Sequence, residues 1–256
     1  MKQETNYLQD IPSGDALIHR EITGPKEAQV MVLLHGNGED LHIYDQQISY
    51  LSAFYRIVAI DTRGHGRSTR GTEPLDYYTF TSDLISVLDA LCIEKATIVG
   101  FSDGAIIALH AAIKCPERIR SMVLIGANYN IKGIRLIPRL QIRLVYIFLS
   151  IAALFSNRAC KRKEIWSLMV YHPNLKKEDI AQIAVPTMVI TGEKDLVSQR
   201  QNDEIHSLIA DSKRLVIPGG DHYWMFKKPV ILSEIIRILE RNDKVNKYLT
   251  LLMLWS

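Results

Sequence analysis

Cysteine is scarce in this chain, and its few cysteines are spaced too irregularly for a metal or redox motif. Cys92, Cys115 and Cys160 form an odd set without a C-x-x-C pair. Neither a disulfide framework nor a zinc site is therefore indicated. The N-terminal segment also lacks the apolar stretch of a secretory signal. These absences together predict a protein of the reducing cytoplasm with an uncleaved N-terminus.

Long hydrophobic runs are missing as well. The longest one extends over twelve residues from Leu144 to Phe155 and is broken only by Ser150. A membrane-spanning helix needs roughly 20 apolar residues, so no transmembrane segment is predicted. We interpret this run as a buried or cap helix. A weak contact with a membrane surface is the alternative, since arginines precede the run.

The chain also lacks a strong excess of charge of either sign. Its 31 basic and 28 acidic residues leave a net charge of +3. That charge is too small for the electrostatic footprint of a nucleic-acid-binding protein. The basic clusters at 161–163 and 176–177 are short and are typical of solvated surfaces. Nucleic acid is therefore not expected as a partner, and no oligomeric state is indicated.

The chain does contain a repeated alternation of strand-like and helix-like segments. Apolar runs at Gln29 to Leu34 and Tyr55 to Ile60 are typical of buried strands, and Ala16 to Thr23 alternates like an edge strand. Residues Tyr78 to Leu91 place apolar side chains at helical spacing. Such alternation predicts an α/β fold, a mostly parallel sheet with helices on both faces.

Strand patterns stop after residue 127 and resume near residue 185. The intervening residues 128–184 have a helical pattern rich in Ile, Leu and Arg. We therefore predict a core made of residues 1–127 and 185–242, with an inserted helical cap at 128–184. The core ends in a predicted helix at 229–241, and residues 243–256 form an apolar C-terminal tail to which no function is assigned.

The residues G-F-S-D-G at 100–104 lie between the apolar run Ala96 to Val99 and a helical pattern. This G-x-S-x-G pattern is typical of a sharp turn that exposes a nucleophilic serine above a sheet. Ser102 is therefore the candidate nucleophile. The pentapeptide alone is weak evidence, because short patterns arise by chance and an ordinary strand-to-helix turn also fits it.

A nucleophilic serine needs a base, and the base needs an acid that orients it. His222 follows a late strand, and Asp195 follows the strand before that one. In a parallel sheet both would lie on the same rim as Ser102. Asp195 is the favoured acid by its position in the loop, while Glu193 and Asp221 remain alternatives. The sequence thus predicts a Ser102, Asp195, His222 triad.

Acyl transfer also requires donors for the developing oxyanion. The turn at Ser102 supplies the backbone N–H of Asp103, and the loop H-G-N-G at 35–38 offers the backbone N–H of Asn37. His35 is expected to be structural. The Asp103 carboxylate is a candidate group for binding a cationic part of a substrate, such as the α-amino group of an amino-acid ester. Its preference for a helix N-terminus is the alternative explanation.

The motifs H-G-N-G, D-T-R-G-H-G-R-S, G-F-S-D-G, G-E-K-D and G-G-D-H occur in one order over roughly residues 15 to 240. In this the chain resembles the α/β-hydrolase fold superfamily, and within it the serine esterases, lysophospholipase-like enzymes and biphenyl-hydrolase-like (valacyclovirase-like) members. The resemblance implies an eight-stranded sheet with a cap after the sixth strand. A serine at position 102, rather than an aspartate, argues against haloalkane dehalogenases.

The expected function is that of a serine hydrolase that cleaves a small carboxylic ester, such as a lysophospholipid or an amino-acid ester. The apolar cap segment from Ile134 to Phe155 indicates a substrate with an apolar part. No metal or organic cofactor is expected. A carbon–carbon bond hydrolase or a cofactor-free haloperoxidase of the same fold is the enzymatic alternative. A non-catalytic, receptor-like ligand-binding homologue is the alternative of another class.

Overall fold

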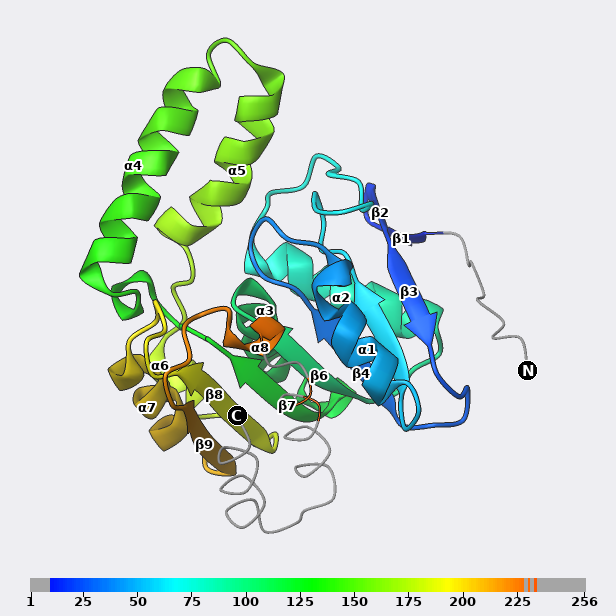
Figure 1. Ribbon diagram of the computed structural model, residues 1–256. Coiled ribbons are helices and arrows are strands. Elements are labelled where there is room, and N and C mark those ends of the chain that lie inside the picture. Colours follow the sequence, from blue (N-terminus) through cyan, green and yellow to red (C-terminus); the bar gives the residue numbers. More distant parts are fainter. Residues whose placement is uncertain (1–9, 228–229, 231–232, 234–256) are drawn as a thin grey trace.

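A seven-stranded sheet forms the centre of the structure, a computed structural model that describes residues 10–227, 230 and 233 (Figure 1). The strand order is β3-β5-β4-β6-β7-β8-β9. Strand β3 runs antiparallel to β5, and all other neighbouring strands are parallel. The seven strands are β3 (Arg20–Thr23), β4 (Val30–Leu34), β5 (Arg56–Ile60), β6 (Ala96–Phe101), β7 (Ile119–Ile125), β8 (Thr187–Gly192) and β9 (Ser212–Ile217).

Helices cover both faces of the sheet, as the apolar residues of the strands require. In β4, Val32 and Leu34 pack into the cluster that includes helices α2, α3 and α7, whereas Met31 and Leu33 pack into the cluster on the side of α1 and α8. This division follows from the alternation of side chains along a strand. The helices on the two faces are α1 (Asp45–Leu51), α2 (Tyr77–Ala90), α3 (Asp103–Lys114), α7 (Gln199–Leu208) and α8 (Trp224–Lys227).

Two further helices, α4 (Leu136–Ala152) and α5 (Asn157–Tyr171), lie between β7 and β8 in the chain. Figure 1 shows them as a pair that projects away from the sheet. Both lie within the range 128–184 that the sequence predicts as the cap. The short helix α6 (Lys177–Ile180) leads back to the sheet, and the 3-10 turn Ile131–Gly133 precedes α4. No described helix is long and apolar enough to cross a membrane.

The predicted edge strand from Ala16 to Thr23 is interrupted, and the described sheet has seven strands instead of the predicted eight. The break occurs at His19, whose backbone N–H donates to Ser68 Oγ at 2.8 Å. Before His19, β2 (Ala16–Ile18) pairs with β1 (Ile11–Ser13) in a separate two-stranded sheet. Only β3 joins the large sheet. Most of the predicted helix at 229–241 and all of the apolar tail at 243–256 lie outside the described residues.

Candidate active site

Ser102 lies on a sharp turn between β6 and α3. It is one of two non-glycine residues in the described chain with a positive φ, at 52°. Its backbone N–H donates to the carbonyl of Ile125 on the neighbouring strand at 2.8 Å. Side chains avoid this region of backbone conformation, so the surrounding structure holds Ser102 in a strained position. The turn has the geometry that the G-x-S-x-G pattern predicts.

The two glycines of this turn are required by close backbone contacts. A Cβ atom at Gly100 would lie 2.3 Å from the carbonyl oxygen of Gly104. A Cβ atom at Gly104 would lie 2.1 Å from the carbonyl oxygen of Leu34 on β4. Neither distance leaves space for a side chain. The turn can therefore lie tightly against the sheet only because both positions lack one.

His222 and Asp195 form a buried pair at the carboxyl end of the sheet. His222 Nδ1 lies 2.7 Å from Asp195 Oδ1. Asp195 is fully buried and His222 is 6% exposed. The backbone N–H of Val197 also donates to Asp195 Oδ1, at 2.9 Å, and fixes the carboxylate. With Nδ1–H directed to the carboxylate, the imidazole presents Nε2 as a proton acceptor.

The two alternative acids have other partners. Glu193 Oε2 accepts a hydrogen bond from the backbone N–H of Gly219 at 2.8 Å. Asp221 accepts one from the backbone N–H of Tyr223 and forms an ion pair with Lys227. Among the three acids that the sequence left open, Asp195 is the one whose carboxylate contacts the His222 ring.

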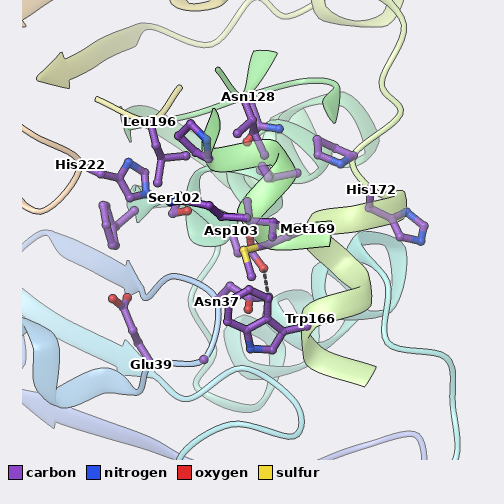
Figure 2. Close-up of a pocket in the computed structure, with 18 of the residues that line it drawn as sticks. Asn37, Glu39, Ser102, Asp103, Asn128, Trp166, Met169, His172, Leu196 and His222 are labelled. Atoms are coloured by element: carbon purple, nitrogen blue, oxygen red, sulfur yellow. Dashed lines mark hydrogen bonds between the residues drawn. The ribbon is translucent and has the colours of Figure 1, made fainter. Parts of the chain in front are cut away.

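A cavity of about 410 Å³ lies between the sheet and the cap. Four of the five predicted site residues line it, and the fifth, Asp195, is buried behind His222. Figure 2 shows Ser102 and His222 in this cavity with side chains contributed by the cap, including Trp166 and Met169 of α5. The four predicted residues that line the cavity are Asn37, Ser102, Asp103 and His222.

Asn37 and Asp103 meet at the cavity wall. The side-chain amide of Asn37 donates to Asp103 Oδ2 at 2.9 Å and to the backbone carbonyl of Ile165 in α5 at 3.0 Å. Within the part of the chain that the structure describes, neither residue uses its backbone N–H to bond another protein group. Both N–H groups are therefore available to an oxygen of a bound substrate.

His35 connects the Asn37 loop to the loop after β5. Its Nε2 accepts a hydrogen bond from the backbone N–H of Thr62 at 3.0 Å, and its Nδ1 lies 2.8 Å from the carbonyl of Gly36. Burial lowers the pKa of His35 to about 3. A neutral imidazole that bonds one backbone group on each side has a structural role, as expected from the sequence.

The Asp103 carboxyl group is buried beside the nucleophile. Only 7% of the residue is exposed, and burial raises the pKa of the Asp103 carboxyl above its usual value. The hydrogen bond from Asn37 opposes this rise because it stabilises the ionised form. An ionised carboxylate that is buried away from water is stabilised by a positively charged partner, and a cationic ligand can supply that charge.

Glu39 also lines the cavity, although the sequence did not indicate it as a site residue. Its Oε2 accepts a hydrogen bond from the backbone N–H of Gly36 at 3.0 Å. Burial raises the pKa of Glu39 to about 7, although that hydrogen bond and the nearby His222 lower it. The signal available in the sequence was an acid only two residues after Asn37. The cavity thus contains two carboxyl groups with raised pKa values.

Residues 29–165 match the family described as alpha/beta hydrolase fold, which is more than half of the chain. The human serine hydrolase BPHL is 28% identical over 227 residues, which cover 80% of this chain and 76% of BPHL. RutD of Azorhizobium caulinodans, provisionally named a carbamate hydrolase, is 25% identical over 252 residues, which cover 87% of this chain and 94% of RutD.

Solved structures agree with this assignment at the level of the fold. The enol-lactonase from Burkholderia xenovorans superposes with a TM-score of 0.74 at 22% identity, over 90% of this chain and 98% of the lactonase. The five sequence motifs, the topology and the family match all agree, and the predicted superfamily is confirmed. The chain belongs to the alpha/beta hydrolase fold family.

Proposed function

We propose that the chain is a serine hydrolase that cleaves a carboxylic ester through an acyl-enzyme on Ser102. The observation that carries this proposal is the buried 2.7 Å pair of His222 and Asp195, at the same cavity as the strained Ser102. A histidine with a purely structural role would not need a buried carboxylate partner beside a serine that lines a cavity. The names of the relatives BPHL and RutD, both hydrolases, support the same reaction class.

The proposed reaction has two halves. His222 Nε2 accepts the proton of the Ser102 hydroxyl while Oγ attacks the ester carbonyl carbon, and the backbone N–H groups of Asn37 and Asp103 hold the oxyanion. The C–O bond to the leaving group breaks, and His222 returns the proton to the departing oxygen. A water then attacks the acyl carbon, with His222 again as base; the bond from that carbon to Ser102 Oγ breaks, His222 returns the proton to Oγ, and the acid is released. Asp195 stabilises the imidazolium in both halves.

A panel of p-nitrophenyl esters of increasing acyl length tests the reaction type. At least one member is expected to be hydrolysed with saturation kinetics, because an activated ester needs only the nucleophile and the oxyanion donors. Release of p-nitrophenolate is followed by absorbance, with Ser102→Ala protein as the blank. No turnover of any ester would contradict the proposal and favour the carbon–carbon bond hydrolase or the receptor-like alternative.

The substrate class that we propose is an ester with a cationic group near the scissile bond. The buried Asp103 carboxylate supports this choice, because an ammonium group would offset the cost of its desolvated charge. The cap side chains beside it, including Trp166 and Met169, can contact an apolar part of the same molecule.

Asp103→Asn is expected to lower kcat/KM for an amino-acid ester about 10-fold or more relative to an uncharged ester of the same shape. A hydrogen bond to a charged group is worth about 1.5 to 3 kcal/mol, whereas the asparagine keeps the shape and can still accept from Asn37. The measurement is the ratio of the two kcat/KM values in each protein. An unchanged ratio would show that Asp103 does not recognise the charge.

We also infer that the protein works in the reducing cytoplasm. Cys92 and Cys160 are free and exposed, and Cys115 is free and half-buried. Exposed free thiols are typical of proteins in reducing compartments.

A further inference from the structure

One face of helix α4 is apolar, and none of the described residues covers it. Seven large apolar side chains along it have exposed fractions between 49% and 69%. They follow a helical spacing of three and four residues and therefore form one continuous stripe. The turn after α4 extends the stripe with Leu154 and Phe155, which are 76% and 86% exposed. The seven residues on the helix are Leu136, Ile137, Leu140, Leu144, Ile147, Phe148 and Ile151.

The opposite face of α4 accounts for the inward packing of the cap. Pro138, Ile142 and Val145 line the cavity, and Leu149 is buried. The exposed stripe is thus a second apolar face, which neither the substrate cavity nor the core of the protein uses. A contiguous exposed apolar surface of this kind marks a contact with a partner or a lipid.

The charge around this stripe indicates which partner fits. Residues 127–163 contain eight basic residues and no acidic residue, although the whole chain carries a net charge of only +3. None of the eight forms an ion pair with another described residue. They are Lys132, Arg135, Arg139, Arg143, Arg158, Lys161, Arg162 and Lys163. Helix α4, the turn after it and the start of α5 therefore present positive charge beside the apolar stripe.

We propose that the exposed face of α4 and the α4–α5 turn dock on the surface of an anionic phospholipid bilayer. An amphipathic helix with basic residues beside an apolar face lies in the interface, with the apolar side chains among the acyl chains and the basic ones at the headgroups. With its 17 residues, α4 is short for a bilayer span. The helix therefore lies on the membrane.

A second copy of the chain fits this face less well. A twofold dimer through α4 would bring the same surface of both copies together. Each copy would then bring basic residues without ion-pair partners to the interface, and residues 127–163 of the other copy would offer them no acidic partner. Anionic headgroups supply the opposite charge, so the membrane surface is the better partner.

Co-sedimentation with phospholipid vesicles tests the proposal without reference to catalysis. The protein is expected to bind vesicles of phosphatidylcholine mixed with phosphatidylglycerol about 100-fold more tightly than vesicles of phosphatidylcholine alone, since each basic residue near the surface adds to the attraction. Binding should weaken as salt is added, because salt screens the charges. Equal binding to both vesicles, or binding to neither, would overturn the proposal.

Two variants test the apolar and the basic residues of this surface separately, and a third variant is the control. Phe148→Ser combined with Phe155→Ser is expected to abolish binding, and the exchange of Arg158 and Arg162 for glutamine should weaken it about 10-fold or more. Phe54→Ser, at a phenylalanine that is 46% exposed on α1's side of the protein, should bind as the wild type does.

Light scattering on the same proteins measures their oligomeric state and so tests the alternative, a dimer formed through the α4 face. A monomeric wild type that binds anionic vesicles supports the proposal. A wild-type dimer that the Phe148→Ser and Phe155→Ser changes convert to monomers would overturn it, and would show that the face joins two copies. If the double variant melts at a lower temperature than the wild type, Phe155→Ser alone serves, because its side chain lies beyond the helix and is 86% exposed.

Discussion

Replacement of Ser102 by alanine is expected to lower kcat for a p-nitrophenyl ester by about 10^5-fold, with little change in KM. The reason is that the nucleophile of a triad acts only in the transition state, and removal of it costs as much as removal of the whole triad. The cavity and the oxyanion donors remain, so binding of the ester persists. The measurement is the steady-state rate of the purified variant against the wild type.

Ser102→Gly is the matched control for this experiment. It is expected to be equally inactive but more stable than the wild type by about 1 kcal/mol, because glycine adopts the φ of 52° without strain. Thermal unfolding measures that difference. Inactive variants that retain a stable fold would show that the loss is chemical. An alanine variant that keeps most of its activity would rule out Ser102 as nucleophile.

Asp195→Asn is expected to lower kcat by about 10^3 to 10^4-fold while the fold persists. The carboxylate accepts the Nδ1–H of His222 at 2.7 Å and so leaves Nε2 free to accept the serine proton. An asparagine amide can donate to Nδ1 instead, which selects the tautomer that carries its proton on Nε2. His222 would then be unable to act as the base. The pH dependence of kcat and kcat/KM for the variant measures this change.

The neighbouring acids provide controls of the same kind. Glu193→Gln and Asp221→Asn should each retain activity within about 3-fold of the wild type, since exposed charges of this sort contribute little. Glu193 bonds the backbone of Gly219, and Asp221 pairs with Lys227. A loss at either position as large as that at Asp195 would contradict the assignment of the acid.

Local patterns in the sequence were sufficient for most of the fold. The predicted strand from Tyr55 to Ile60 begins one residue before β5, and the predicted helix from Tyr78 to Leu91 begins and ends one residue after α2. Both segments have their apolar side chains at the spacing that their own element requires. The predicted α/β-hydrolase fold is confirmed by the family match and by the solved structures.

The interrupted edge strand shows where local patterns fail. The alternation from Ala16 to Thr23 is that of one strand, but His19 donates its backbone N–H to Ser68, far along the chain. A pattern within eight residues contains no information about that partner. The extra pairing of β2 with β1 follows from the same break.

The sequence indicated some of the site residues and not others. The G-x-S-x-G turn and the order of Ser102, Asp195 and His222 carry a sequence signature, but the choice of Asp195 over its neighbours depends on the distance to His222. Glu39 had no signature, because its raised pKa results from burial in the assembled cavity. The sequence also did not predict that the apolar side chains on α4 point outward. An apolar run such as Leu144 to Phe155 is typical of a buried helix, and only the folded structure shows that these side chains are exposed.

We propose that Ser102 is an activated nucleophile, and a reaction with a fluorophosphonate probe tests this most directly. The wild type is expected to gain the mass of one phosphonyl group, located by peptide mass spectrometry on Ser102, and Ser102→Ala is expected to gain none. His222→Ala should react far more slowly, because the serine then lacks its base. Labelling at another residue, or a wild type that hydrolyses esters yet remains unlabelled, would contradict the account.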